Sequence, residues 1–86
     1  MDPIATLAII NDPSEDADTR ASHMHYLAEW LAKGGACPFN ARLSRETMVF
    51  AEDSARETHE LAAALNCAVI NCDPSGLRGI GYEVVS

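Results

Sequence analysis

The most reactive side chains in this sequence are three cysteines, Cys37, Cys67 and Cys72. Thiolates act as nucleophiles or as zinc ligands, and a structural zinc site needs four ligands, usually in closely spaced pairs. Cys67 and Cys72 are five residues apart, so on a strand they would point to opposite faces. This spacing opposes a local disulfide and a two-sulfur zinc clip. We therefore expect three reduced, buried thiols and no metal site.

The candidate general bases are His23, His25 and His59. None of them belongs to a motif with a serine or cysteine nucleophile, and Cys67 lies in an apolar run that disfavours the reactive thiolate. The glycines near the C-terminus do not have the spacing of a dinucleotide-binding loop. We expect a protein that is not an enzyme and has no cofactor, with a small thiol-dependent enzyme as an alternative.

Charge is the strongest global feature of the composition. The 86 residues include 13 acidic and 6 basic side chains, which gives a net charge of −7. An acidic protein repels the phosphate backbone, so direct binding of nucleic acid is not expected. A negative surface instead favours association with a basic protein.

The segment from Asp12 to Gly35 organises the chain, because its start, period and end are all visible. Asp12 is a good N-cap, Pro13 suits the first helical position, and Glu15 completes a capping box. Gly34 can supply the left-handed residue that ends the helix. The sequence predicts a helix over residues 13–33.

An aromatic ridge runs beside the apolar face of this predicted helix. His23, Tyr26 and Trp30 have i, i+3, i+7 spacing, with Leu27 in the seam between them. The ridge fits a core face packed on another helix, a self-interface or an interface with another protein. Because Trp and Tyr often anchor interfaces, His23, Tyr26, Leu27 and Trp30 are the candidate interface residues.

Two further helices are expected, over residues 3–10 and 45–65. Asp2 and Pro3 repeat the cap and proline pattern, and Ile4, Leu7 and Ala8 would form the inner face of the first helix; a strand over residues 5–10 is the alternative. The connector between the second and third helices would fold Phe39 back into the core. Ser44 can cap the helix over residues 45–65, and the alternative is a strand at 47–51 followed by a helix that Ser54 caps.

A single helix over residues 45–65 would align four acidic side chains on its exposed side. We take these as a candidate acidic surface for a basic partner, although a solvated helix face with ordinary surface ion pairs is the simpler explanation. The four residues are Glu46, Asp53, Glu57 and Glu60.

The C-terminal residues read as a β-hairpin, with strands at about 67–72 and 80–85 around a turn at Asp73 to Gly76. The predicted class is therefore α+β, mainly helical, in one domain over residues 1–86. Helices followed by a hairpin also match a winged-helix transcriptional regulator, but the acidic third helix disfavours DNA reading. The sequence has neither a membrane-spanning run nor a secretory leader, which predicts a cytoplasmic protein with no membrane contact.

Part of the predicted second helix resembles a stretch in small uncharacterised proteins of phages, prophages and bacteria. The resemblance covers about a quarter of the chain and implies no function, and Cys37 stands where a larger apolar residue is expected before the proline. The residues that carry it, besides the acidic cluster up to Asp18, are Asp12, Pro13, Arg20, Leu27, Trp30, Leu31, Gly34 and Gly35.

These observations favour a small acidic protein–protein interaction module, expected to be a homodimer that associates through the aromatic ridge. If it is phage-encoded, it could inhibit a basic, nucleic-acid-binding host or defence protein by occupying its groove.

Overall fold

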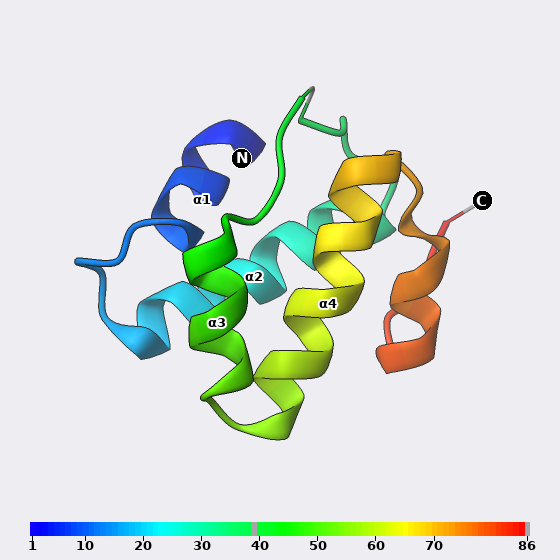
Figure 1. The fold of residues 1–86 in the computed structure, drawn as a ribbon. Helices are drawn as coiled ribbons and strands as arrows, with labels where there is room; N and C mark the ends of the chain where they lie inside the picture. The colour runs from blue at the N-terminus through cyan, green and yellow to red at the C-terminus, as the bar shows by residue number, and fades with distance from the viewer. Residues whose placement is uncertain (39, 86) are drawn as a thin grey trace.

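The computed structural model describes residues 1–38 and 40–85, and all the regular elements in these residues are helices. They are α1 (Pro3–Ile10), α2 (Ala17–Ala32), α3 (Arg45–Glu52), α4 (Arg56–Asn71) and the 3₁₀ helix η1 (Pro74–Ile80). Helix α1 packs on α2, α4 lies between α3 and η1, and α2 contacts α4 and η1 (Figure 1). None of these helices is long and apolar enough to cross a bilayer. The expected position of Phe39 in the core lies outside the described residues.

The first helix begins as predicted, but the second begins later. The Asp2 carboxylate accepts hydrogen bonds from the backbone N–H groups of Ile4 and Ala5, at 3.0 and 3.3 Å. Asp12 does not cap α2, because its carboxylate accepts hydrogen bonds from the hydroxyl and the backbone N–H of Ser14, which also lower its pKa. Asp12 therefore forms a local turn, and α2 starts at Ala17.

The end of α2 confirms the predicted glycine stop. Gly34 has φ of +88°, and the backbone N–H of Gly35 donates to the carbonyl of Trp30 at 2.8 Å. A left-handed residue followed by a backbone hydrogen bond between residues five positions apart is the usual way to satisfy the last carbonyls of a helix.

The hydrophobic core forms where α2 faces α4, and Leu7 and Ile10 of α1 and Leu77 of η1 complete it. The fully buried residues that contribute the largest apolar side chains are Ile10, Met24, Leu27, Leu65, Val69 and Leu77. Met24, Leu27 and Leu65 lie in the predicted helices, whereas Val69 and Leu77 belong to the segment predicted as a hairpin. On α1, however, Thr6, Leu7 and Ile10 face inward, so the predicted inner positions of Ile4 and Ala8 are wrong.

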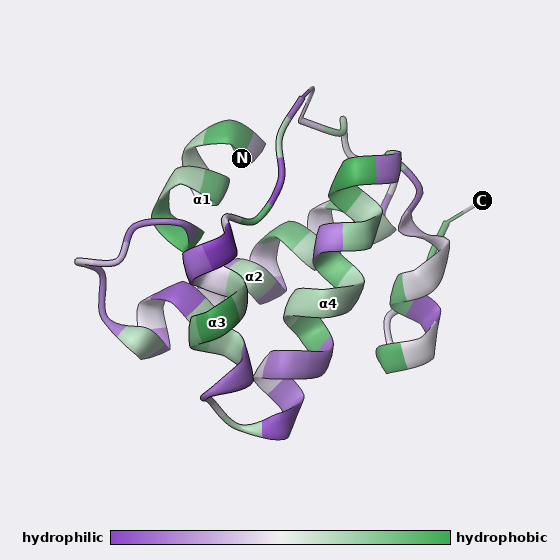
Figure 2. Ribbon diagram, viewed as in Figure 1, coloured by the Kyte–Doolittle hydropathy of each residue, from purple (hydrophilic) through white to green (hydrophobic). Residues whose placement is uncertain are grey.

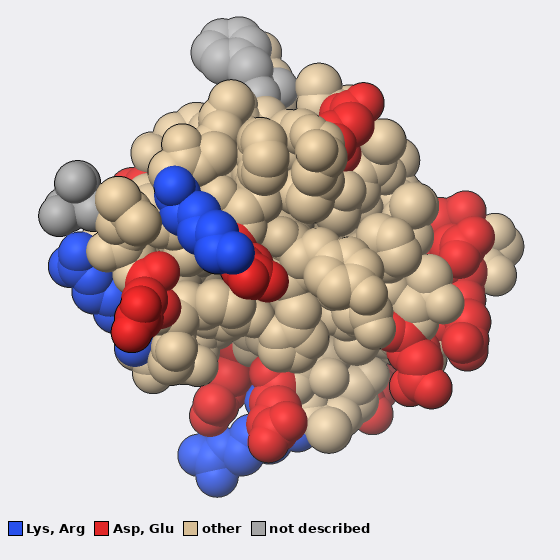
Figure 3. Space-filling view, turned by 180° about the vertical axis from the view of Figure 1, so that it is seen from behind, with Lys and Arg blue, Asp and Glu red and all other residues tan. Residues whose placement is uncertain are grey.

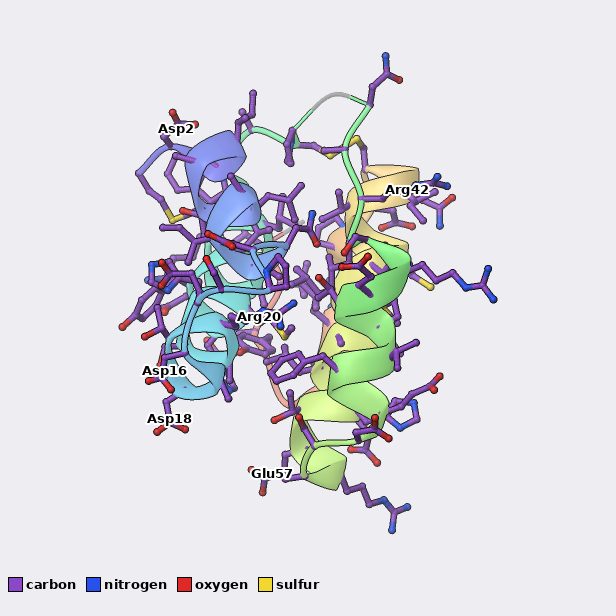
Figure 4. The ribbon with its side chains drawn as sticks, turned by 60° about the vertical axis from the view of Figure 1, so that its left-hand side comes forward. Asp2, Asp16, Asp18, Arg20, Arg42 and Glu57 are labelled. Atoms are coloured by element: carbon purple, nitrogen blue, oxygen red, sulfur yellow. A yellow bond between two sulfur atoms is a disulfide. The ribbon has the colours of Figure 1, made fainter. Side chains whose placement is uncertain are left out.

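Arg20 of α2 is a charged residue inside this fold, with only 5% of its surface exposed. Its Nε donates to the carbonyl of Ile10 at the end of α1 (2.9 Å), and its Nη2 donates to Thr47 Oγ1 of α3 (3.0 Å). The guanidinium carbon also lies 4.1 Å from the centre of the Phe50 ring. Figure 4 shows Arg20 between the helices, directed away from solvent. One side chain thus links α1, α2 and α3.

The predicted continuous helix over residues 45–65 is wrong, because the chain reverses between α3 and α4. Ser44 caps α3 as expected, through a 3.1 Å hydrogen bond from the backbone N–H of Thr47. At the other end, the Ser54 hydroxyl donates to the carbonyl of Phe50 at 2.8 Å. This bond competes with continuation of the helix. The reversal buries Thr47 and Ala51 of α3 as well as the apolar side of α4.

The predicted C-terminal hairpin is also wrong, and with it the predicted α+β class, because all the regular elements in residues 1–38 and 40–85 are helices. Residues 67–71 form the last turns of α4, where Ala68 and Val69 continue the buried helical face, and Cys72 ends the helix with φ of +49°. The Asp73 carboxylate then accepts a hydrogen bond from Ser75 N–H at the start of η1. A short Val-Ile run has strand propensity, but burial on a helical period outweighs it. The winged-helix alternative loses the hairpin on which it rested.

Cysteine pairing differs from the expectation of three reduced thiols. Cys37 and Cys72 form a disulfide with a Cα–Cα distance of 5.7 Å, while Cys67 is free and exposed. The sequence argument considered only the local pair Cys67 and Cys72. The fold instead brings together residues 35 positions apart and ties the connector between α2 and α3 to the end of α4.

We expect a Cys37→Ser/Cys72→Ser variant to lose about 3 to 4 kcal/mol of unfolding free energy, because the bond closes a loop of this length. Urea unfolding followed by circular dichroism measures the loss. Cys67→Ser is the matched control and should behave like the wild type. Titration of denatured, unreduced protein should find a single free thiol, and three would contradict the pairing.

Candidate interaction surfaces

The four predicted interface residues are divided between core and surface. Leu27 is completely buried and belongs to the core. Tyr26 is 52% exposed, and His23 is partly buried, with its ring centre 5.2 Å from that of Tyr26 in an edge-to-face arrangement. His23 Nδ1 lies 2.7 Å from the carbonyl of Thr19, which fixes the imidazole along the helix. The aromatic ridge therefore reaches solvent mainly through Tyr26.

Trp30 is partly buried and held in one orientation by the end of its own helix. Its Nε1 donates to the carbonyl of Ala36 at 3.0 Å. Gly35 lies against the indole so closely that a Cβ at this position would overlap the ring. The double glycine thus ends α2 and also makes room for Trp30.

The exposed side of α1 is unusually apolar. Met1 and Ile4 are 55% and 65% exposed, and Ala5 and Ala8 also face solvent. On a helical wheel Ile4, Ala5 and Ala8 fall within an arc of about 100°, opposite the buried residues, and Met1 precedes the N-cap Asp2 of this helix. Figure 2 shows hydrophobic colour along most of α1. Its sequence, PIATLAII, has one polar residue. When one side of this helix packs on a neighbouring helix, the side that faces solvent is therefore still apolar.

Met1 joins this apolar face to the aromatic ridge. It lines a hollow of about 330 Å³ together with Tyr26, Trp30, Glu29 and Lys33. The last two form a salt bridge of 2.8 Å at the rim, and the hydrogen bond from Lys33 lowers the pKa of Glu29.

We call Met1, Ile4, Tyr26 and Trp30 the α1–α2 surface. Figure 3 views the molecule from behind and shows a broad area of uncharged side chains, interrupted by a basic side chain next to an acidic one, with other acidic side chains mostly near its edges. An apolar centre with a charged rim is typical of protein–protein interfaces. Sequence reasoning identified the aromatic half of this surface and missed the half on α1, for which the lack of polar residues in α1 was the available signal.

The predicted acidic surface is divided by the reversal between α3 and α4. Glu46 lies in the first turn of α3, whereas Asp53 follows the last turn, and Glu57 and Glu60 lie at the start of α4. A helix of eight residues is about 12 Å long, so Glu46 is separated from the other three.

The fold adds two carboxylates from the start of α2 to the remaining acidic residues. In Figure 4, Asp16, Asp18 and Glu57 lie toward the same end of the molecule, away from Asp2 and Arg42. Within this group Glu60 is paired with Arg56 at 3.2 Å. We call the following five residues the acidic end: Asp16, Asp18, Asp53, Glu57 and Glu60.

A polar pair, separate from the α1–α2 surface, joins α2 to the segment after η1. His25 Nδ1 forms a short hydrogen bond with the Tyr82 hydroxyl, beside a hollow of about 210 Å³ that Glu57 and Glu60 also line. Burial raises the pKa of Tyr82, and the negative charge of Glu29 raises it further. A neutral phenol bonded to imidazole tethers the chain rather than supplying a nucleophile. The two residues are 57 positions apart, so no local pattern could have predicted the contact.

Reactive groups are not otherwise gathered in the described part of the chain. Residues 1–38 and 40–85 contain no group of three His, Cys, Asp or Glu side chains arranged for a metal ion. Cys37 and Cys72 are bonded to each other, and Cys67 lies on the exposed side of α4. In the alternative of a thiol-dependent enzyme, the nucleophile would therefore be Cys67.

Gly35→Ala should displace the Trp30 indole, because the added methyl group would occupy the space of the ring. We expect a loss of about 1 to 3 kcal/mol in unfolding free energy and a red shift in the emission of this single tryptophan. Gly76→Ala is the matched control, since a Cβ there meets open space. Equal effects of the two substitutions would contradict the close packing at Gly35.

Comparisons with known proteins add no relationship. The chain matched no family model, no curated protein and no solved structure. The resemblance to small phage and bacterial proteins, carried by residues 12–35, therefore stays a prediction. The functional argument rests on the surfaces described above.

Proposed function

We propose that this chain is a non-enzymatic protein–protein interaction module and that the α1–α2 surface is its main contact face. The observation that carries the proposal is the joined exposure of Met1, Ile4 and Tyr26. Burying an exposed side chain of this size contributes about 1.5 to 3 kcal/mol. The pre-oriented Trp30 beside them lowers the entropy cost of association.

A second copy of the chain is the proposed occupant, which gives a homodimer. The exposed face of α1 carries only Ile and Ala side chains, with Met1 next to it, so two such faces are complementary to each other in an isologous contact. Ala5 and Ala8 are small and permit a close approach of two helices. A domain of 86 residues also has a modest core, and dimerisation adds buried apolar area.

The test is the mass of the protein in solution, measured by light scattering after size-exclusion chromatography. We expect a dimer for the wild type and a monomer for Ile4→Asn and for Tyr26→Glu, because each places a polar group in the apolar contact. Ile70→Asn is the matched control, since Ile70 is similarly exposed (54%) but lies on α4.

Two results would refute the homodimer. One is a monomeric wild type at concentrations far above those used for the variants. The other is loss of the dimer in Ile70→Asn but not in Ile4→Asn, which would move the interface to α4. Circular dichroism of every variant establishes that the helices are retained.

A second candidate function uses the acidic end to bind a basic protein, as an inhibitor that competes with nucleic acid. The specific observation is that the fold gathers carboxylates from the start of α2 and the start of α4 at one end. If the protein is phage-encoded, the target would be a basic, nucleic-acid-binding host or defence protein. Closely placed carboxylates can imitate the charge of a phosphate backbone.

This inhibitor function is tested with an immobilised basic DNA-binding domain as the probe. We expect binding that weakens with salt, that duplex DNA displaces, and that is about tenfold weaker in Asp16→Asn/Asp18→Asn/Glu57→Gln, from three lost surface pairs. Glu46→Gln is the charge control. Binding that persists unchanged at high salt would contradict electrostatic mimicry.

We also propose that the protein is cytoplasmic, which determines the redox state of its cysteine pair. Disulfides persist mainly in oxidising compartments, whereas the cytosol keeps thiols reduced. In the cytoplasm the Cys37–Cys72 pair would therefore be reduced, and the connector between α2 and α3 would rely on its apolar and polar contacts alone.

A further inference from the structure

A hollow lies between α4 and the start of α3 and shares no lining residue with the α1–α2 surface. It is a groove of about 620 Å³. Leu43 forms its buried floor, the partly buried Met48 lies beside it, and Ile70 of α4 forms an exposed apolar wall. The remaining lining residues are polar: Arg42, Ser44, Arg45 and Asn66.

The walls of the groove are linked by hydrogen bonds and are therefore formed before any partner arrives. The backbone N–H of Leu43 donates to Asn66 Oδ1 of α4 at 3.0 Å. On the other side, Asn11 accepts from the backbone N–H of Ser44 (2.8 Å) and donates to the carbonyl of Arg42 (3.1 Å). Because the groove is already formed, binding of a ligand does not carry the entropy cost of ordering the groove.

The groove is a positive site on a negative protein. Lys33 and Arg56 are paired with carboxylates, and Arg20 is buried. Arg42 and Arg45, by contrast, are exposed at the groove, and the described residues offer neither of them a salt-bridge partner within 4.0 Å.

The acidic end does not cancel this positive charge. Helix α3 separates Arg45 from Asp53 by about 12 Å, which exceeds the Debye length of about 8 Å at physiological salt. Glu46 follows Arg45 in the sequence but does not line the groove. A carboxylate held between Arg42 and Arg45 would therefore meet a locally favourable field.

We propose that this groove binds an acidic segment of a partner protein. One apolar side chain of the segment sits against Met48 and Ile70, and flanking carboxylates pair with Arg42 and Arg45. The proposal is independent of the homodimer and of the acidic end, since it uses none of their residues.

A separate partner fits the groove better than a second copy of this chain. None of the side chains between the carboxylates of the acidic end is large and apolar: they are Ala17, Ser54, Ala55, Arg56, Thr58 and His59. The acidic end can supply charge but no large apolar group to cover Ile70. The groove therefore calls for a segment that combines both, such as a leucine flanked by glutamates.

The test measures binding of a fluorescein-labelled synthetic peptide, with one leucine between pairs of glutamates, by fluorescence anisotropy at low ionic strength. We expect saturable binding to the wild type that is about tenfold weaker in Arg42→Glu/Arg45→Glu, because two pairs become repulsive. Ile70→Asn should weaken binding about fivefold through the lost apolar contact. The matched controls are Arg78→Glu and Val49→Asn, which lie outside the groove and should bind as the wild type does.

Several outcomes would overturn the proposal. They are the absence of saturable binding to the wild type, equal affinity of the wild type and the double arginine variant, and equal binding of a peptide with lysines in place of glutamates. Light scattering adds another: if the wild type self-associates and Arg42→Glu/Arg45→Glu does not, the acidic end of a second copy fills the groove. Because all the substituted side chains are exposed, circular dichroism should show an unchanged fold.

Discussion

The buried guanidinium of Arg20 is the constraint on which the arrangement of the first three helices depends. A charge removed from water is costly unless polar groups surround it. Here the carbonyl of Ile10, at the negative end of α1, and the hydroxyl of Thr47 on α3 accept its hydrogen bonds, while the Phe50 ring covers one face. Satisfying this one cation therefore fixes both neighbouring helices against α2.

The same polar network extends to the groove. Thr47 Oγ1 donates to Asn11 Oδ1 at 2.9 Å, and Asn11 in turn holds the backbone at Arg42 and Ser44. The side chains that bury Arg20 thus also position the groove wall. On the opposite side of α1, the inward placement of Leu7 and Ile10 forces Ile4 to face solvent. One packing solution accounts for both the apolar face and the positive groove.

Local structure was largely predictable, and its failures have local causes. The caps at Asp2 and Ser44, the glycine stop at Gly34 and the buried period of α2 depend on contacts within about five residues. Asp12 was a plausible cap, but its carboxylate instead accepts hydrogen bonds from Ser14 in a local turn. The segment after Leu65 was misread as a strand, because the four apolar residues 67–70 satisfy either period until the rest of the helix face is known.

The sequence by itself determined the helical character of the segments up to Leu65, the caps at Asp2 and Ser44, the glycine stop at Gly34, the net charge of −7 and the aromatic ridge. These properties follow from composition and from short-range hydrogen bonds. Only the tertiary structure decided where the chain reverses between α3 and α4, that Cys37 pairs with Cys72, that Leu27 is core while Tyr26 is exposed, and that Arg42 and Arg45 border a groove. The physical reason is that burial and cross-linking depend on which distant segments share the core, and spacing along the chain does not specify those neighbours.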